Sequence, residues 1–254
     1  VFSTREIYYI QGTGRGTFFP LPMKAKPGAQ SLRGAVSVAG KGIYHTGPDG
    51  IYLFSSGSDT KITEDSLEPL FRGEETQGMP GVADMTTAFL YAYKNRLYFG
   101  YRSTGYSYPT NLIVMNLDTS RIAYYSYGIE IRSIATDNAN DRIVIGDNTG
   151  FVRVIESPSY TDDAGTVICF ELQGKDFELQ TRKHFPRWAK YDVDASTAAS
   201  CTGALLLDGV IHQSHTLNEN RNTRRRLVET GNGNRISHRI SGTGQVSIYA
   251  VESE

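Results

Sequence analysis

Apolar residues recur at every second position over short stretches of this chain, and clusters of polar residues and glycine separate the stretches. This period is typical of β-strands that bury one face. The clearest stretch predicts three strands, at 35–39, 43–46 and 51–54. Gly40 and Gly42 supply the first turn and Pro48 and Gly50 the second, because proline presets one turn dihedral and glycine tolerates positive φ. With a candidate fourth strand at 61–63, the stretch predicts an antiparallel meander, which is the shape of a β-propeller blade.

Two later segments repeat this arrangement of strands and turns. The second meander is predicted at 87–93, 96–101, 111–117 and 121–125, and the third at 130–136, 142–146 and 151–155, with 167–172 as its closing strand. The first turns lie near Lys41, Asn95 and Asp141, so the spacings are 54 and 46 residues. Propeller repeats span about 40–50 residues, but no Trp-Asp or Gly-His signature recurs. The pattern favours a degenerate, partial propeller, with a generic antiparallel sandwich built from meanders as the alternative.

The first residues predict a hairpin that belongs to an incomplete blade. Strands are expected at 6–10 and 17–19, and Pro20, Pro22 and Pro27 keep the 20–27 segment out of any central ladder. The chain begins without a methionine and leads directly into a strand, so we expect it to be a fragment of a longer polypeptide. Residues 64–71 have acidic residues near their start and predict a short helical turn between blades.

From about Gly174 the spacing changes and predicts a second domain. Strands are expected at 177–179, 187–193, 203–212, 224–228, 235–241 and 245–251. Their apolar positions alternate, as one buried face of a small β-sandwich requires. These positions are Tyr191, Val193, Leu205, Leu207, Leu227, Ile236, Ile240, Val246, Ile248 and Ala250. The sequence therefore predicts an all-β protein, with β-propeller blades at 1–173 and a small antiparallel β-sandwich at 174–254.

The composition restricts the partners of the chain. Its 254 residues include 26 basic and 27 acidic side chains, for a net charge of −1. This balance argues against nonspecific adhesion to nucleic acid or to a membrane surface. No apolar run reaches the roughly 18 residues of a membrane-spanning helix, so no membrane span is predicted. Cys169 and Cys201 are too few for a disulfide framework, and both are expected to be reduced and to serve as small apolar residues.

Three short motifs invite a ligand-binding interpretation, and each has a simpler one. The glycine-rich run 12–16 resembles a phosphate loop, but no helix comes after it to hold a pyrophosphate, so a hairpin loop is favoured. His212 and His215 point to opposite faces of a strand, with Cys201 upstream, which disfavours a metal site. The acidic turn at 137–141 lacks the glycine and the distal glutamate of a calcium loop, and we interpret it as a solvated hairpin turn.

Three consecutive arginines at 224–226, with Arg221, Arg235 and Arg239 nearby, are the main local concentration of charge. They could contact DNA phosphates or an acidic neighbouring subunit. Outward residues of a strand whose aliphatic stems pack flat would give the same pattern. We expect surface structure with contacts inside an assembly, rather than affinity for DNA.

The sequence contains no recognisable catalytic motif. It has no G-x-S-x-G element, no paired His/Cys setting and no sialidase-type Asp-box. Its acidic residues are scattered over turns, so a glycosidase pair could be assembled only by folding. The sequence therefore assigns no catalytic, cofactor-binding or metal-binding residue, and it predicts a protein without enzymatic activity.

Four segments of the chain carry a recognisable pattern. They are FSTREIYYIQG at 2–12, AVSVAGKGIYHTGPDGIYLF at 35–54, KITEDSLEPLF at 61–71, and the ending TRRRLVETGNGNRISHRISGTGQVSIYAVESE at 223–254. Together they resemble the tail hub, nozzle or packaged-DNA stabilisation proteins of short-tailed bacteriophages. The resemblance implies a structural protein of the virion tail, in a ring of copies that is commonly sixfold. It also implies contact with other tail, adaptor or portal proteins, and DNA that passes through the channel without specific binding. Loops at 103–110 and 161–165 are the expected contact points within the ring.

A carbohydrate-binding or carbohydrate-cleaving propeller, such as a receptor-binding tail protein, is the alternative. Aromatic rings offer stacking surfaces for sugars, and the second meander is rich in them. The tyrosines in question are Tyr91, Tyr93, Tyr98, Tyr101, Tyr106 and Tyr108. The simpler interpretation is that half of them belong to the core and the rest to blade edges.

Overall fold

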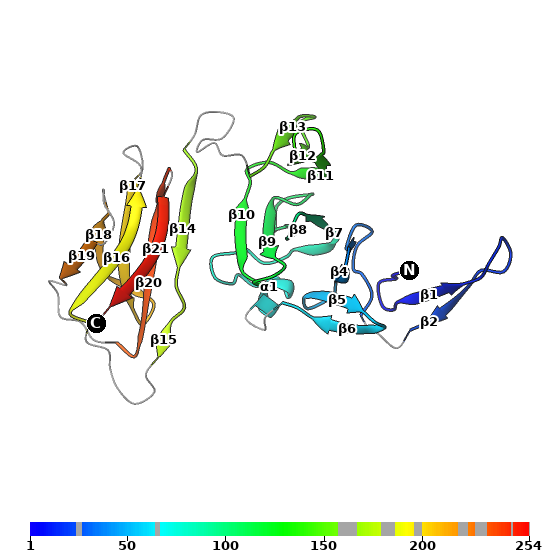
Figure 1. Cartoon of the computed structure of the whole chain (residues 1–254), viewed down its shortest axis with the longest axis horizontal. Coiled ribbons are helices and arrows are strands. Elements are labelled where there is room, and N and C mark those ends of the chain that lie inside the picture. The colour runs from blue at the N-terminus through cyan, green and yellow to red at the C-terminus, as the bar shows by residue number, and fades with distance from the viewer. Residues whose placement is uncertain are drawn as a thin grey trace. The chain divides into compact units, whose positions relative to one another are not determined.

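The computed structural model describes most of the chain (Figure 1). The described residues are 1–23, 27–63, 67–156, 167–178, 186–195, 200–217, 223–226, 233–244 and 246–253. These ranges form strands joined by turns, with one four-residue helix, which confirms the all-β prediction. No helix within them is long and apolar enough to cross a membrane. The chain divides into two compact units, Val1–Ser157 (unit 1) and Pro158–Glu254 (unit 2).

The first sheet of unit 1 is the predicted four-stranded antiparallel meander. It consists of β3 (Ala35–Val38), β4 (Gly42–Thr46), β5 (Ile51–Ser55) and β6 (Ser58–Lys61), paired in that order. The fourth strand begins before the predicted 61–63 because Ser56 and Gly57 both have positive φ and reverse the chain in a two-residue turn. The helix α1 (Glu68–Phe71) comes next, inside the segment for which a helical turn was predicted.

The second and third sheets are also antiparallel meanders. The second has four strands, β7 (Asp84–Tyr93), β8 (Arg96–Arg102), β9 (Asn111–Asn116) and β10 (Ile122–Ser126), as predicted. The third has three strands within the described part of the chain, β11 (Ile131–Asp137), β12 (Arg142–Asp147) and β13 (Val152–Val154). Each sheet thus has the strand order of a propeller blade, so unit 1 is propeller-like.

The predicted closing strand of the third meander belongs to unit 2 instead. Strand β14 (Cys169–Gln173) pairs with β20 (Arg235–Thr243), in the register Cys169↔Thr243 to Gln173↔Arg239. This ladder takes up one edge of β14, and it places Phe170 against the core of unit 2. The prediction for 167–172 was therefore wrong. The boundary between the two units lies between Ser157 and Pro158, rather than between 173 and 174.

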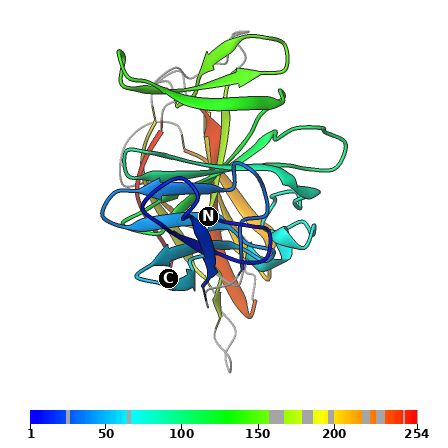
Figure 2. The ribbon, with the colours of Figure 1, turned by 90° about the vertical axis from the view of Figure 1, so that its right-hand side faces the viewer.

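The second sheet lies between the first and the third within unit 1 (Figure 2). Strand β8 shows this most directly, because five successive residues from Leu97 to Tyr101 are buried. Leu97, Phe99 and Tyr101 pack into a cluster with the first sheet and α1. Tyr98 packs on the other side, into a cluster with the third sheet. Since successive side chains of a strand point to opposite faces, burial of both sets requires a sheet on each side.

The N-terminal segment covers the free side of the first sheet and then extends into a hairpin. Phe2 packs on this side with its ring centroid 4.9 Å from that of His45 and 6.1 Å from that of Phe54. Ile7 is buried beside it. Beyond Ile7 the chain forms the antiparallel hairpin of β1 (Tyr8–Gln11) and β2 (Phe19–Pro22), in the register Tyr8↔Pro22 to Gln11↔Phe19. The side chains of the hairpin are largely exposed.

Unit 2 is the predicted β-sandwich. One sheet contains β14, β15 (Phe177–Glu178), β20, β17 (Ser200–Leu207) and β18 (Val210–Thr216), and the other contains β19 (Thr223–Arg226), β16 (Trp188–Ala195) and β21 (Val246–Ser253). Both sheets contribute to one core. The predicted residues in this core are Tyr191, Val193, Leu205, Leu207, Ile236, Ile240, Val246 and Ile248. Leu227 lies outside the described residues.

The predicted single strand at 203–212 is a hairpin of two strands. Asp208 and Gly209 have φ of 52° and 81°, so β17 and β18 are joined by a two-residue turn with positive φ at both positions. Asp-Gly is a strong sequence signal for this turn. The turn separates Leu207 from Val210 and sends β18 back along β17.

The two cysteines are free and differ in burial. Cys201 lies in the sandwich core, in the apolar role predicted for it. Cys169 is exposed on β14, so its predicted role as an apolar filler was wrong. The reason is the alternation along β14, which directs the neighbouring Phe170 to the core instead.

The stability of unit 2 is expected to depend on pH through His238. Its ring lies edge-on to Tyr191, with the centroids 5.8 Å apart. Burial lowers the pKa of His238 below its usual 6.5, because the charged ring loses hydration. The unfolded chain therefore takes up the proton first, so this stability is present above pH 6.5 and is lost as the pH falls towards the folded pKa. Each unit of pKa difference corresponds to about 1.4 kcal/mol.

We expect urea unfolding, monitored by the fluorescence of Trp188 on β16, to show a lower midpoint at about pH 5 than at about pH 7.5. The variant His238→Gln has no titrating ring and should lose part of this difference. An equal pH dependence in both proteins would contradict the assignment to His238.

Candidate functional site

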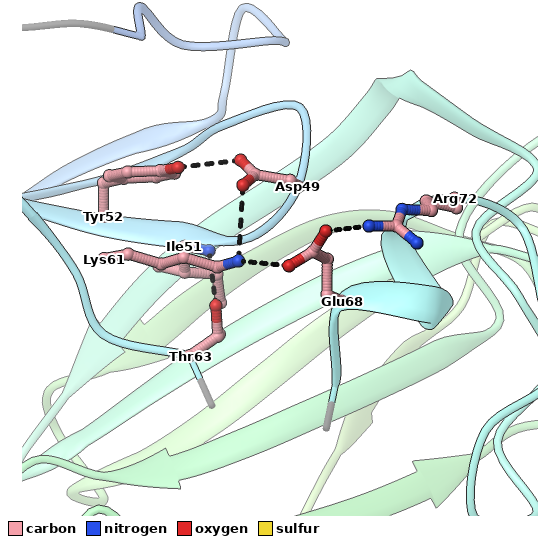
Figure 3. Close-up of polar contacts among 7 residues, drawn as sticks. All are labelled: Asp49, Ile51, Tyr52, Lys61, Thr63, Glu68 and Arg72. Carbon is pink, nitrogen blue, oxygen red and sulfur yellow. Dashed lines mark hydrogen bonds and ion pairs between the residues drawn. The ribbon is translucent and has the colours of Figure 1, made fainter. Parts of the chain in front are cut away.

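A charged network joins the first sheet to α1 (Figure 3). Lys61, at the end of β6, places its Nζ 3.3 Å from Oδ2 of Asp49 and 3.1 Å from Oε2 of Glu68. Asp49 lies in the turn between β4 and β5, and Glu68 is the first residue of α1. Two carboxylates therefore flank one ammonium group. This is the one cluster in the described part of unit 1 where a lysine bridges two acidic side chains.

Further hydrogen bonds fix the geometry of this network. The Tyr52 hydroxyl donates to Oδ1 of Asp49 at 2.7 Å. Arg72 forms an ion pair with Glu68 one helical turn away. The backbone N–H of Ile51 donates to Oγ1 of Thr63 at 3.3 Å. The network thus ties the β4–β5 turn to the helix that packs against the second sheet.

The shifted pKa values show what this network can do chemically. Desolvation opposes ionisation of Asp49, but hydrogen bonds from Tyr52 and Lys61 outweigh it and hold its pKa below the usual value. The hydrogen bond from Lys61 and the charge of Arg72 likewise lower the pKa of Glu68. Desolvation opposes protonation of Lys61, yet the two carboxylates raise its pKa. Both carboxyl groups are therefore held ionised, whereas a glycosidase pair needs one that is protonated near neutral pH.

The other carboxyl groups with shifted pKa values have shifts in the same direction. Hydrogen bonds are the leading cause of a lowered pKa for Asp84, Asp118, Asp137, Asp141 and Asp147. Every pKa shift recorded for a described carboxyl group is thus downward. Desolvated acids with raised pKa values are typical of catalytic centres. The pKa values of these carboxyl groups are lowered instead.

A buried histidine–aspartate pair lies under the N-terminal segment. Nε2 of His45 is 2.8 Å from Oδ1 of Asp59, and the two side chains are 0% and 4% exposed. Phe2 covers His45 on one side, and the ring of Tyr52 stacks against it with a centroid distance of 5.7 Å. Among the described residues, Nδ1 of His45 and Oδ2 of Asp59 have no hydrogen-bond partner. Sequence reasoning did not identify this pair, although a histidine inside the apolar run of β4 was a signal for it.

The glycine-rich run and the acidic turn are both hairpin loops, as predicted. Residues 12–16 join β1 to β2, and Oγ1 of Thr17 accepts hydrogen bonds from the N–H groups of Thr13 and Gly14. The acidic turn joins β11 to β12. Its Asp137 accepts a 2.8 Å hydrogen bond from Nε of Arg142, and its Asp141 forms an ion pair with Lys94 at 2.8 Å. These carboxylates are therefore already paired with basic side chains of the protein.

Among the described side chains of unit 2, the histidines form no metal site. His212 and His215 both lie on β18, and no group of three or more potential metal ligands occurs among the described residues. Strand β19 places Arg224 to Arg226 opposite Lys190, Ala189 and Trp188 of β16. Arg239 lies 3.5 Å from Oε1 of Glu171 on the neighbouring strand.

The six tyrosines considered for sugar stacking fall into three environments. Tyr98 and Tyr101 are in the core. Tyr91 and Tyr93 are half-buried, and their hydroxyls contact the third sheet at Thr136 and Asp141. In the 103–110 loop, Tyr108 stacks under the guanidinium of Arg132 and Tyr106 is exposed. Most of the rings considered for sugar stacking are therefore engaged within the protein. The 161–165 loop lies outside the described residues.

Exposed apolar side chains gather on one face of a sheet at two separate places in the described part of unit 1. The first, which we call the hairpin surface, consists of Tyr9, Phe19 and Leu21, which share one face of the β1–β2 hairpin. The second is the outer face of the third sheet, opposite the face that packs on the second sheet. It consists of the exposed Val152 and Val154, together with Ala135 and the half-buried Val144. Sequence reasoning identified neither surface, because alternation predicts one buried face and does not tell which faces lack a partner.

No protein-family model matches this chain, and no curated protein sequence does. Among solved structures, the chain is similar to a glycoside hydrolase family 43 arabinoxylan arabinofuranohydrolase from Bacillus subtilis, with a TM-score of 0.20 and 10% identity over 70% of this chain and 55% of that chain. It is also similar to an exo-β-1,3-galactanase from Phanerochaete chrysosporium, with a TM-score of 0.23 and 7% identity over 82% of this chain and 64% of that one. The chain spans less than two thirds of the length of either structure. Likeness at these TM-scores carries no argument about function.

Proposed function

We propose that this chain is a structural protein of a bacteriophage tail and works as one copy in a closed ring. The observation that supports this best is the presence of two different exposed apolar surfaces on unit 1, the hairpin surface and the outer face of the third sheet. A ring of identical subunits requires a heterologous interface, in which two different surfaces of the same chain meet. Apolar side chains gathered at a surface mark interaction sites.

Two further observations support a structural role. Four segments of the sequence, at 2–12, 35–54, 61–71 and 223–254, resemble tail hub, nozzle and DNA-stabilisation proteins, and that resemblance supplies the sixfold ring and the DNA conduit. The described carboxyl groups with shifted pKa values are all held ionised, which suits ion pairs better than acid catalysis. In this proposal the neighbours of the chain are its own copies and other tail, adaptor or portal proteins.

Cryo-electron microscopy of the intact particle tests the proposal. We expect a rotational ring of this chain coaxial with the tail, with DNA or an open channel on the axis. A mass-spectrometric inventory of the purified particle should contain the chain in a fixed ratio to the other tail proteins. Isolated copies on fibres, or a pool of the chain in host cells that never enters particles, would refute the proposal.

A further inference from the structure

We infer that the β1–β2 hairpin of one copy packs its hairpin surface onto the outer face of the third sheet of the next copy. The inference rests on the proposed function, because it specifies the contact that builds the ring. The occupant of each surface is a second copy of this chain. Tyr9, Phe19 and Leu21 of one copy would cover Val152 and Val154 of its neighbour.

The hairpin lacks the burial that its composition requires. The eight residues of β1 and β2 include one polar side chain, Gln11, and the others are aromatic, aliphatic or proline. Tyr9, Phe19 and Leu21 remain 58%, 49% and 40% exposed. An isolated two-stranded hairpin is marginally stable in water. A hairpin of this composition is stabilised when one of its faces is covered.

Within the described part of the chain, no sheet packs on the outer face of the third sheet. The second sheet is covered on both faces, and the first is covered by the second sheet and by the N-terminal segment. The third sheet packs one face on the second sheet through Ile143 and Ile145. On its other face Val152 is 74% exposed within the described part of the chain. Stacked sheets pack about 10 Å apart, and a two-stranded apolar sheet is the shape that fits this face.

The hairpin cannot reach this face within its own copy. Its base is held on the free side of the first sheet by Phe2 and by the buried Ile7. The first, second and third sheets are stacked in that order, so the two surfaces lie at opposite ends of the stack. Two sheet-to-sheet spacings separate them by roughly 20 Å. A contact between them is therefore intermolecular and head-to-tail, which closes into a ring or continues as a filament.

The available area suits a small interface. An aromatic side chain buries about 150–250 Å² when it is fully covered, so Tyr9, Phe19 and Leu21, which are about half exposed, present on the order of 300 Å² of apolar surface. A standard interface buries about 800 Å² on each partner, and weaker contacts bury less. Gln11 on the same face, the hairpin backbone and the polar loop at 12–16 can supply the polar rim that such interfaces have.

Two substitutions test the contact from its two sides. Phe19→Asp damages the hairpin surface and leaves the outer face intact, and Val152→Asp does the reverse. Both side chains are exposed, so neither change should alter the thermal unfolding of the free chain by much. Each should weaken self-association by about 100-fold or more, because the new carboxylate would be buried without a partner. The control Leu32→Asp, at an exposed apolar residue outside both surfaces, should associate as the unchanged protein does.

The measurement is sedimentation velocity of the full 254-residue chain at about 100 µM. At this concentration an interface with a Kd of about 10 µM is mostly occupied. The unchanged protein should form oligomers and each variant alone should be monomeric. An equimolar mixture should stop at a heterodimer, because the Val152→Asp copy still offers a hairpin and the Phe19→Asp copy still offers a face. A monomeric unchanged protein, or a mixture that stays monomeric, would overturn the inference. A particle whose tail contains the chain in a ring, with the hairpin seated on a different protein, would overturn it and leave the proposed function standing.

Discussion

Replacing Phe99 by alanine is expected to destabilise unit 1 by about 3–5 kcal/mol, the usual cost of deleting a buried phenylalanine ring. Phe99 is buried on β8, in the cluster between the first and second sheets. Its ring stacks on Phe71 of α1, with centroids 5.4 Å apart, and on Tyr101, with centroids 5.5 Å apart. The substitution removes both stacking contacts and leaves a cavity that two sheets and a helix would have to close together. Domains are typically stable by about 5–15 kcal/mol, so this loss approaches the whole stability of the unit.

The two units allow the measurement to be made selectively. The chain has one tryptophan, Trp188, and it lies on β16 in unit 2. In urea unfolding, tryptophan fluorescence therefore reports unit 2, whereas far-ultraviolet circular dichroism reports both units. We expect Phe99→Ala to shift the part of the dichroism transition that belongs to unit 1 and to leave the fluorescence midpoint in place.

A matched control uses a phenylalanine in the same unit that is not buried. Phe151, beside β13, is 64% exposed, and Phe151→Ala should change stability by no more than about 0.5 kcal/mol. If the two alanine variants unfolded at the same urea concentration, Phe99 would not be at the centre of a shared core. A shift of both transitions by Phe99→Ala would instead mean that the two units unfold as one.

The strands of unit 1 could be predicted from sequence because their signals are local. The turns that contain Gly40, Pro48 and Gly50 fall where the chain reverses. Even the burial of β8 on both faces has a local signal, since its apolar residues run on without alternation from Leu97 to Phe99. Nothing local says which sheet covers which face, because that depends on the path of the whole chain.

The errors arose where pairing is long-range or where a turn was overlooked. Strand β14 resembles any half-buried strand, and its partner β20 lies more than sixty residues later in the sequence. No spacing rule predicts that pairing, so β14 was attached to the nearest meander. The hairpin at Asp208-Gly209 was different, since the dipeptide itself is a turn signal. It was missed because the apolar residues on both sides suggested one continuous strand.

The candidate surfaces and the buried pair could not be predicted for a related reason. EIYYI reads as a strand, and only the structure shows that its Tyr9 and Ile10, together with the side chains of β2, remain exposed. His45 and Asp59 are separated by fourteen residues, and β5 lies between their strands. Their contact depends on the register of two successive hairpins, which a shift of one residue would abolish.

The second large effect on stability is expected at the buried pair of His45 and Asp59. Replacing His45 by alanine is expected to cost unit 1 about 3–5 kcal/mol, because removing one member of a buried pair leaves the other group without its partner. Asp59 is 4% exposed, and its Oδ1 would lose the 2.8 Å contact with Nε2 of His45. Its Oδ2 has no hydrogen-bond partner among the described residues, so the carboxylate would have none of the compensation that buried polar groups require.

The same substitution should release the N-terminal segment. Phe2 packs on the His45 ring, and of its two ring contacts only the edge contact with Phe54 would remain. We therefore expect trypsin to cleave after Arg5 faster in His45→Ala than in the unchanged chain. Asp59→Asn is the matched control, because the amide keeps the shape of the side chain and can still hydrogen-bond to His45. It should cost less than about 1.5 kcal/mol, and the double variant should be more stable than the sum of the two single losses predicts. Equal losses from His45→Ala and Asp59→Asn, with strictly additive behaviour in the double variant, would show that the two side chains do not depend on each other.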